Sequence, residues 1–334
     1  MRRRIRLTCG ILLLALCFRL VAYAQKIEGV ETVGFTVSDM QRSLNFYTRV
    51  LRFQKISDRQ VSGPDFAGLK GLPSASARVV RLKLGEEEIE LTQYLEPKGR
   101  PFPESARPND GSFQHIAIIV RDMDEAYAVL RQNRVRHASS YPQRLPDWNK
   151  GAAGIRAFYF RDPDGHFLEL LEFPSDKGLA KWHRAGSELF LGIDHTAIVV
   201  ADTEQSLRFY RDLLGMRIAG ESENYGAEQE HLNGVFGAHL RITSLRAERG
   251  PGIELLEYLA PTDGRPAPAD VRANDLLHWE TRVATDAGAL AKLQEAGVAA
   301  ASSKLHKWVG EPGAEFIVRD PGRHAIVFHS AVSN

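Results

Sequence analysis

The stretch GIDHTAIVVADTEQSLRFYRDLLG, residues 192–215, carries the signals of a strand, a turn and a helix in quick succession. Its first part is apolar and β-branched, which predicts a strand. Asp202 or Thr203 then suits the N-cap of a helix, because a side-chain oxygen there can accept a free backbone N–H. Leu207 and Tyr210 fall on one helical face, and Gly215 is expected to end the helix.

The same pattern occurs earlier in the chain, as VETVGFTVSDMQRSLNFYTRVLRF at residues 30–53. Asp39 corresponds to Asp202 and Ser43 to Ser206 at one offset (202 − 39 = 206 − 43 = 163). The chain is therefore a tandem duplication, and one half can be interpreted by laying it on the other.

Composition is that of an ordinary globular protein, with 43 lysines and arginines against 42 aspartates and glutamates. This balance gives no basic face for nucleic acid, so a small molecule is the expected partner.

The N-terminal residues 1–24 have the pattern of an export signal. A basic start precedes an apolar run at residues 11–16, and Ala22-Tyr23-Ala24 is an A-x-A cleavage site. Arg19 leaves the apolar run well short of the roughly 20 residues that a membrane span needs. We therefore expect a periplasmic or secreted protein, cleaved after Ala24 and free of the membrane. Cys9 and Cys17 both lie in this segment, so no disulfide is expected after cleavage.

Strand and helix signals divide the rest of the chain into four units of β-α-β-β-β order, which is an α+β fold. The first domain is predicted at 27–175, with units at 27–96 and 111–173. After a connector at 176–190, the second domain is predicted at 191–330, with units at 191–260 and 275–330.

Four such units in two similar pairs resemble the vicinal oxygen chelate superfamily, which includes glyoxalase I, bleomycin-resistance proteins and extradiol dioxygenases. The motifs that carry the resemblance are the first-strand histidines, the SLxFYxxxL helices and FYFRDPDGHFLEL at residues 158–170. The resemblance implies that units pair into cup-shaped, partly closed mixed sheets with helices outside. It also implies a divalent metal in the cup.

In that family each unit offers one metal ligand from its first strand and one from its last strand. The corresponding positions, in order of the units, are Thr32 and Glu90, His115 and Glu169, His195 and Glu254, and His278 and Val327. Valine cannot ligate a metal and a threonine hydroxyl is a poor ligand, so Thr32 and Val327 depart from the pattern.

The residues themselves agree with this assignment. His115 and His195 interrupt strands of isoleucine, valine and alanine, and Glu169 stands between two leucines. An ionised carboxylate in such a strand either faces solvent or meets a cation, because burying it unpaired is costly.

Unit pairing decides which ligands meet. If units two and three pair, one site contains His115, Glu169, His195 and Glu254, and both losses fall in the other site. If each half closes on itself, the sites are His195, Glu254 and His278, and Glu90, His115 and Glu169. We favour the first pairing because it places both departures in one site.

Histidine and carboxylate ligands suit Fe2+, Mn2+, Ni2+ or Zn2+. By resemblance, the substrate is a catechol, diol or hydroxy-ketone chelated through vicinal oxygens, and the reaction is of the dioxygenase or lyase/isomerase type. Glu169 or Glu254 would move the proton in a glyoxalase-like reaction. Part of an extradiol signature is present, but Lys150, Gly151 and Ala152 stand where it wants a histidine.

Further residues are candidates for the pocket wall: Tyr159, Trp148, Tyr225, His231 and His239. The alternative function is sequestration of a small ligand without chemistry, as in bleomycin resistance. The active species is expected to be a monomer or a homodimer, since four units already supply the pairs that smaller relatives obtain by dimerising.

Overall fold

The computed structural model describes residues 26–286, 288–298, 305–307 and 313–331. Two mixed β-sheets dominate this part of the chain. Sheet A has the strand order β15 (Ala314–Arg319), β16 (Ala325–Ser330), β14 (Trp279–Ala284), β1 (Gly29–Thr36), β4 (Glu87–Glu96), β3 (Ser76–Leu84), β2 (Gln54–Ser62). Sheet B has the order β11 (Arg217–Tyr225), β12 (His239–Arg246), β13 (Gly252–Ala260), β10 (Phe190–Val199), β5 (Gln114–Val120), β9 (Phe167–Glu172), β8 (Arg156–Arg161), β6 (Arg136–His137), with β7 (Gln143–Arg144) beside β8.

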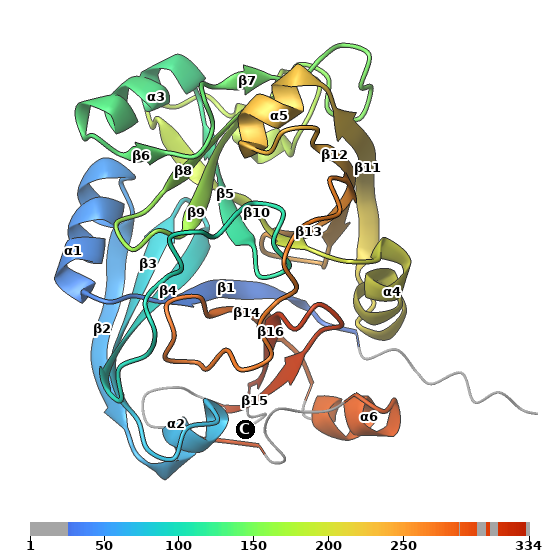
Figure 1. The fold of residues 1–334 in the computed structure, drawn as a ribbon. Helices are drawn as coiled ribbons and strands as arrows, with labels where there is room; N and C mark the ends of the chain where they lie inside the picture. Colours follow the sequence, from blue (N-terminus) through green and yellow to red (C-terminus); the bar gives the residue numbers. More distant parts are fainter. Residues whose placement is uncertain (1–25, 287, 299–304, 308–312, 332–334) are drawn as a thin grey trace, which may run out of the picture.

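The helices are short and lie outside the sheets (Figure 1). They are α1 (Met40–Asn45), continued by η1 (Phe46–Val50), α2 (Pro64–Leu69), α3 (Met123–Gln132), η2 (Ala180–His183), α4 (Thr203–Leu207), continued by η3 (Arg208–Leu213), α5 (Ala227–Asn233) and α6 (Ala289–Glu295). Asp39 and Asp202 are the N-caps of α1 and α4, where each side chain accepts a backbone N–H three residues on. Gly215 follows η3 and has φ +72°. This left-handed conformation favours glycine over any residue with a Cβ.

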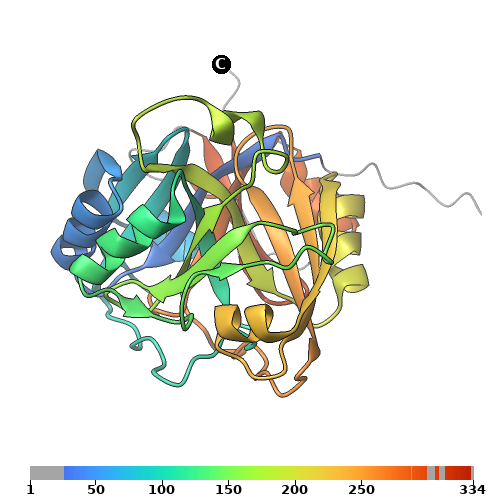
Figure 2. The same ribbon diagram turned by 90° about the horizontal axis from the view of Figure 1, so that it is seen from above.

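The α+β prediction is confirmed, and the pairing of units crosses the two halves of the chain. Strand β5 of unit two pairs with β10 of unit three, and β1 of unit one pairs with β14 of unit four. The green strands of unit two and the yellow-to-orange strands of unit three accordingly lie side by side (Figures 1 and 2). The alternative, in which each half closes on itself, is wrong.

The two linkers between units cross each other and are held by matching ion pairs. Arg100 of the first linker binds Asp275, and Arg265 of the second binds Asp110. The backbone repeats the symmetry, since the N–H of Gly111 donates to Arg265 and that of Leu276 to Arg100. The two halves are thus related by an approximate twofold arrangement that lets residues be compared in pairs.

Strand alternation gives each sheet two different faces. Residues such as Ile116 and Ile118 of β5 join Val33 and Phe35 of β1 in a core shared by both sheets. On the opposite face of sheet B, which we call face B, Ala117 and its neighbours form a second apolar cluster. The equivalent face of sheet A, face A, has its own cluster. Helices α5 and α2 lie at opposite ends of the molecule, near faces B and A respectively (Figure 1).

None of the helices in the described residues is both long enough and apolar enough to span a membrane. The predicted export signal at residues 1–24 lies outside the described residues.

Candidate metal centre

Four acid and imidazole side chains meet on face B, one from each of four adjacent strands. His115 comes from β5, Glu169 from β9, His195 from β10 and Glu254 from β13. His115 Nε2 lies 3.1 Å from Glu169 Oε2, and His195 Nε2 lies 3.7 Å from the same oxygen and 3.5 Å from Glu254 Oε1. The set predicted for paired units two and three is therefore brought together.

Register explains this convergence. Ala197 of β10 lies opposite His115 in the antiparallel pair and beside Glu254 in the parallel pair, while Ala117 lies beside Glu169. All four functional side chains point to face B because they alternate with core residues along their strands. The small side chains of Ala117 and Ala197 leave room between them.

Glu169 is only 5% exposed, and its ion-pair partners among the described residues are both histidines. No lysine or arginine pair is found for it in the described part of the chain. A buried carboxylate in this position is stabilised by a cation, and no lysine or arginine of the described residues supplies one.

Asp194 fixes the ring of His195. Its carboxylate lies 3.0 Å from His195 Nδ1 and is itself held by Arg246 at 2.7 Å and by the indole N–H of Trp182 at 2.9 Å. A carboxylate on one imidazole nitrogen leaves the other nitrogen as the ligand, the arrangement that supports metal-binding histidines. His195 Nε2 has no hydrogen-bond partner in the described structure.

The electrostatics of the site favour positive charge. Burial by itself lowers the pKa of His195, but the carboxylates of Glu254, Asp194 and Glu169 outweigh it and raise this pKa to about 9. Burial, followed by the charge of Glu169, raises the pKa of Tyr159 well above its usual value. The surplus of negative charge is therefore large enough to hold a cation.

The donor set fits a divalent metal. One atom each from His115, Glu169 and His195 lies within 4.8 Å of the other two. Ligands about 2.1 Å from a common ion lie roughly 3–4 Å apart, so small side-chain movements would complete the coordination. Two imidazoles and carboxylate oxygens suit Fe2+, Mn2+, Ni2+ or Zn2+.

Glu169, His195 and Glu254 form part of the wall of a cavity of about 430 Å³. Among the predicted wall residues, Tyr159 lines it. Trp148, Tyr225, His231 and His239 do not: Trp148 packs against Tyr225 in a tilted pair with ring centroids 4.4 Å apart, and both are about half exposed. This part of the pocket prediction is wrong, because the aromatic pair packs outside the cavity.

Neighbours of the mispredicted residues line the cavity in their place. Asn224 and Gln229, which are hydrogen-bonded to each other at 3.1 Å, form a polar part of the wall, and Leu232 an apolar part. Asp194 and Ser244 were also missed. A signal existed for Asp194, since an aspartate directly before a strand histidine is well placed to orient it.

On face A, the first-strand position of unit four lies two residues further along the chain than predicted. Gly34 of β1, the counterpart of Ala197, lies opposite Glu280 and not opposite His278. His278 precedes β14, and its carbonyl accepts from Thr36 as the carbonyl of Phe113 accepts from Val199. Glu280 therefore occupies the position of His115, and the assignment of His278 as a first-strand ligand is wrong.

On face A the buried glutamates are paired with protein cations, whereas no lysine or arginine of the described residues pairs with Glu169 or Glu254 on face B. Glu90 is bound by Arg81 at 2.8 Å, and Glu280 by the ammonium group of Lys70 at 2.6 Å. Burial by itself raises the pKa of Glu280, but the charge of Lys70 and the hydrogen bond from His278 lower it well below the usual range. Thr32 and Val327 are both buried on face A. As predicted, neither side chain offers a good metal ligand.

Comparisons with known proteins show the family and the fold. The family model described as Glyoxalase/Bleomycin resistance protein/Dioxygenase superfamily matches residues 29–170 and 192–328. Glyoxalase I from Zea mays has the same fold at a TM-score of 0.56 and 16% identity, over 92% of both chains. A putative dioxygenase from Bacillus subtilis gives 0.58 and 14%, over 93% of this chain and 87% of the other.

Two curated relatives are similar in sequence. A 2-epi-5-epi-valiolone epimerase from Actinomyces is 31% identical over 44% of this chain and 80% of its own length. The lactoylglutathione lyase of Schizosaccharomyces pombe is 28% identical over 60% of this chain and 61% of its own length.

Proposed function

Because the chain belongs to the Glyoxalase/Bleomycin resistance protein/Dioxygenase superfamily, we propose that it is a divalent-metal-dependent lyase or isomerase. Its substrate would be a small molecule with vicinal oxygens, a diol or hydroxy-ketone. The reaction would move a proton on the carbon next to a carbonyl group.

The observation that carries this proposal is the placement of two glutamates on either side of one metal-binding histidine. Glu169 comes from β9 and Glu254 from β13, and they approach His195 Nε2 to 3.7 and 3.5 Å from opposite edges of the site. His115, His195 and one glutamate can hold the metal while the other glutamate accepts and returns a proton.

A bound divalent ion would polarise the substrate carbonyl and so acidify the neighbouring C–H. The chain supplies the rest. Glu254 is more exposed than Glu169, with 17% of its side chain accessible against 7%, and Ser244 donates a 2.7 Å hydrogen bond to it. We assign proton transfer to Glu254 and primarily ligation to Glu169. Tyr159 and the apolar wall limit water at the reacting carbon.

Ring cleavage of a catechol is a second candidate, because His115, His195 and Glu169 make a two-histidine, one-carboxylate set able to bind Fe2+. Gly151 and Ala152 line the cavity where an extradiol enzyme would carry an acid/base histidine. The lack of such a group at these residues favours proton transfer. Sequestration of a ligand without chemistry is the remaining alternative.

The test is metal loading followed by hydrogen exchange. Purified protein is loaded separately with each of the four metals and incubated in D2O with a panel of hydroxy-ketones, and deuterium incorporation is followed by NMR. Exchange should appear with at least one metal and fall about 100-fold or more in Glu254→Gln. His231→Gln, an exposed histidine outside the cavity, is the control and should behave as wild type.

The outcomes separate the candidates. Oxygen uptake with a catechol, without exchange, would favour the dioxygenase. Failure to bind any of the metals would refute the enzyme proposal and leave a ligand-binding protein.

We also propose export, on the basis of the N-terminal pattern at residues 1–24. N-terminal sequencing of the protein expressed in a bacterium should find Gln25 as the first residue in the periplasmic or secreted fraction. A cytosolic product that retains Met1 would contradict this proposal.

A further inference from the structure

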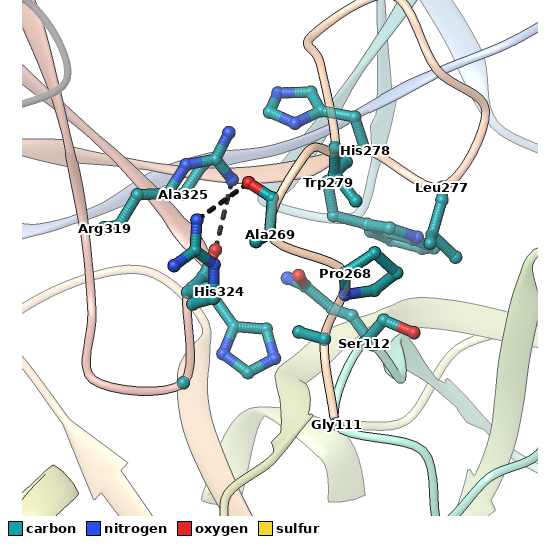
Figure 3. A pocket seen from close by; sticks show the side chains of 15 residues that line it. Gly111, Ser112, Pro268, Ala269, Leu277, His278, Trp279, Arg319, His324 and Ala325 are labelled. Carbon is teal, nitrogen blue, oxygen red and sulfur yellow. Dashed lines mark hydrogen bonds between the residues drawn. The ribbon is translucent and has the colours of Figure 1, made fainter. Parts of the chain in front are cut away.

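A second cavity, of about 100 Å³, shares no lining residue with the cavity at the metal centre (Figure 3). Four segments line it: residues 111–114 of the first linker and β5, 267–271 of the second linker, 277–279 before β14, and 319–325 between β15 and β16. The walls are contributed by both crossing linkers.

The cavity exists because positions that carry large side chains around unit two carry small side chains at the corresponding places around unit four. Phe102 of the first linker packs on the ring of His166 of unit two, with ring centroids 5.2 Å apart, and lies 6.5 Å from the ring of Phe167. The matched linker ion pairs align Phe102 with Ala267, and the matched hairpins align Phe167 with Ala325. Both alanines line the cavity.

The space is bordered by histidine nitrogens that lack partners. His278 stands where unit two has Phe113, is 4% exposed, and has no hydrogen bond at Nδ1. His324 is 8% exposed and has none at Nε2. Its counterpart His166 uses the same nitrogen for a 2.7 Å hydrogen bond to the carbonyl of Leu276. Leaving such atoms unpaired in a buried site is costly, so a ligand at the cavity would satisfy them.

Two arginines add positive charge beside these imidazoles (Figure 3). Burial lowers the pKa of Arg319. Glu280 and Asp320 offset part of this lowering, whereas Arg323 adds to it. Arg319 donates to the carbonyl of Arg323 at 3.1 Å, and Arg323 to that of Ala269 at 2.9 Å.

Arg323 occupies a strained backbone position. Its φ is +73°, where the matching hairpin of unit two has Gly165 at +105°. A left-handed arginine is less stable than a glycine there, and such strain is often found at functional sites. This strained position brings the guanidinium group of Arg323 to the cavity.

We propose that this cavity is a binding site for a small oxyanion that also carries an O–H group. The guanidinium groups of Arg319 and Arg323 would hold the anionic oxygens, because arginine pairs strongly with such groups. The histidines define the O–H requirement. His278 Nε2 faces Glu280 and His324 Nδ1 faces Asp320, so their donors are used and the free nitrogens are acceptors in the neutral ring. Hydrogen phosphate and 2-hydroxy acids share this chemistry.

The test is a calorimetric titration of the metal-loaded protein with phosphate, lactate and acetate at constant ionic strength. Phosphate, lactate or both should bind, and acetate, which has no O–H at neutral pH, should bind at least about 10-fold more weakly. Lactate binding stronger than phosphate would identify a hydroxy acid as the ligand, and the reverse an inorganic oxyanion.

Two variants reproduce the other half of the molecule. Ala267→Phe refills the space, and Arg323→Gly removes one guanidinium and relieves the positive φ. Each should weaken binding about 10-fold or more while leaving thermal stability unchanged or raised. Arg49→Gln removes an exposed arginine of η1 and is the charge control. Glu169→Ala should keep the binding, which separates this cavity from chelation at the metal centre.

Equal binding of acetate and lactate, no binding of either O–H-bearing anion, or full binding in both Ala267→Phe and Arg323→Gly would overturn the proposal. Loss of binding in Glu169→Ala alone would also overturn it, since the anion would then be a ligand of the metal. The proposed enzymatic function is independent of these outcomes.

Discussion

Faces A and B come from the same repeated units, yet they neutralise their buried carboxylates differently. On face B the register partner of Glu254 is Ser244, a neutral hydrogen-bond donor. On face A the register partner of the equivalent Glu90 is Arg81. One replacement on a neighbouring strand thus supplies a permanent cation to one glutamate and none to the other.

The helices beside the two faces show the same contrast. Lys70, directly after α2, donates to Glu280 of face A. At the matching place in α5, Asn233 donates to the hydroxyl of Tyr258. The space on face A is also filled, since Phe66 and Leu69 of α2 pack with Val327 in one buried cluster. Face A is therefore a structural ion-pair network, while face B retains a cavity and glutamates that no lysine or arginine of the described residues neutralises.

The largest expected difference between the faces is in metal binding. Glu169→Ala removes the more buried of the two glutamates of face B and should weaken metal affinity about 1000-fold or more, which metal titration with mass-spectrometric quantification would measure. Glu90→Gln, on face A, should leave the metal content at about one per chain. Equal loss in both variants would mean that the faces do not differ as described.

Removing the cation that pairs with Glu280 on face A should lower the stability of the protein. Lys70→Met leaves the carboxylate of Glu280 buried, with His278 as its remaining hydrogen-bond partner in the described part of the chain, and should lower the free energy of unfolding by about 3–5 kcal/mol. Urea denaturation would measure the change. Lys292→Met breaks the exposed pair with Asp286 and should cost at most about 1 kcal/mol. A comparable effect of the two variants would refute the structural role of Lys70.

The single replacement that separates the faces can be transferred. Ser244→Arg places a guanidinium beside Glu254, as Arg81 lies beside Glu90, and should reduce metal affinity about 100-fold through like-charge competition. Isothermal titration would measure the affinity, and Ser244→Thr, which keeps the hydroxyl, is the control. Unchanged affinity in Ser244→Arg would show that Glu254 takes no part in holding the metal.

Asp194 should contribute a smaller effect, because it acts through His195. Asp194→Asn keeps the shape but weakens the orientation of the imidazole, and should lower metal affinity about 10- to 100-fold. Competition with a metal-binding dye would show it. Full affinity in this variant would mean that Arg246 and Trp182 position the site without the aspartate charge.

Acid should gradually remove the stability that the carboxylate of Glu280 contributes on face A. Since the pKa of Glu280 is lowered in the folded protein, its contribution is fully present above the unfolded value of about 4.3 and is lost as the pH falls below that value. Urea midpoints measured from pH 7 to pH 3 should fall by a larger amount in wild type than in Lys70→Met. Parallel curves would show that this pair does not contribute to acid sensitivity.

Much of the fold was predictable from local patterns. The strand-turn-helix repeat was correct, and Asp202 is the N-cap of the two candidates offered, because strand alternation and helix capping depend on neighbours in the sequence. The clustering of His115, Glu169, His195 and Glu254 was also predicted, once units two and three were taken as the pair.

What the sequence by itself determined is the set of units, the residues that alternate onto each face, and therefore which histidines and carboxylates could reach a common site. Only the tertiary structure decided that Glu280, and not His278, takes the position of His115. A shift of two residues keeps a strand's alternation intact, so no local pattern reports it. The same holds for Lys70 and Arg81, whose role depends on strand and helix contacts that bring charges together across the fold.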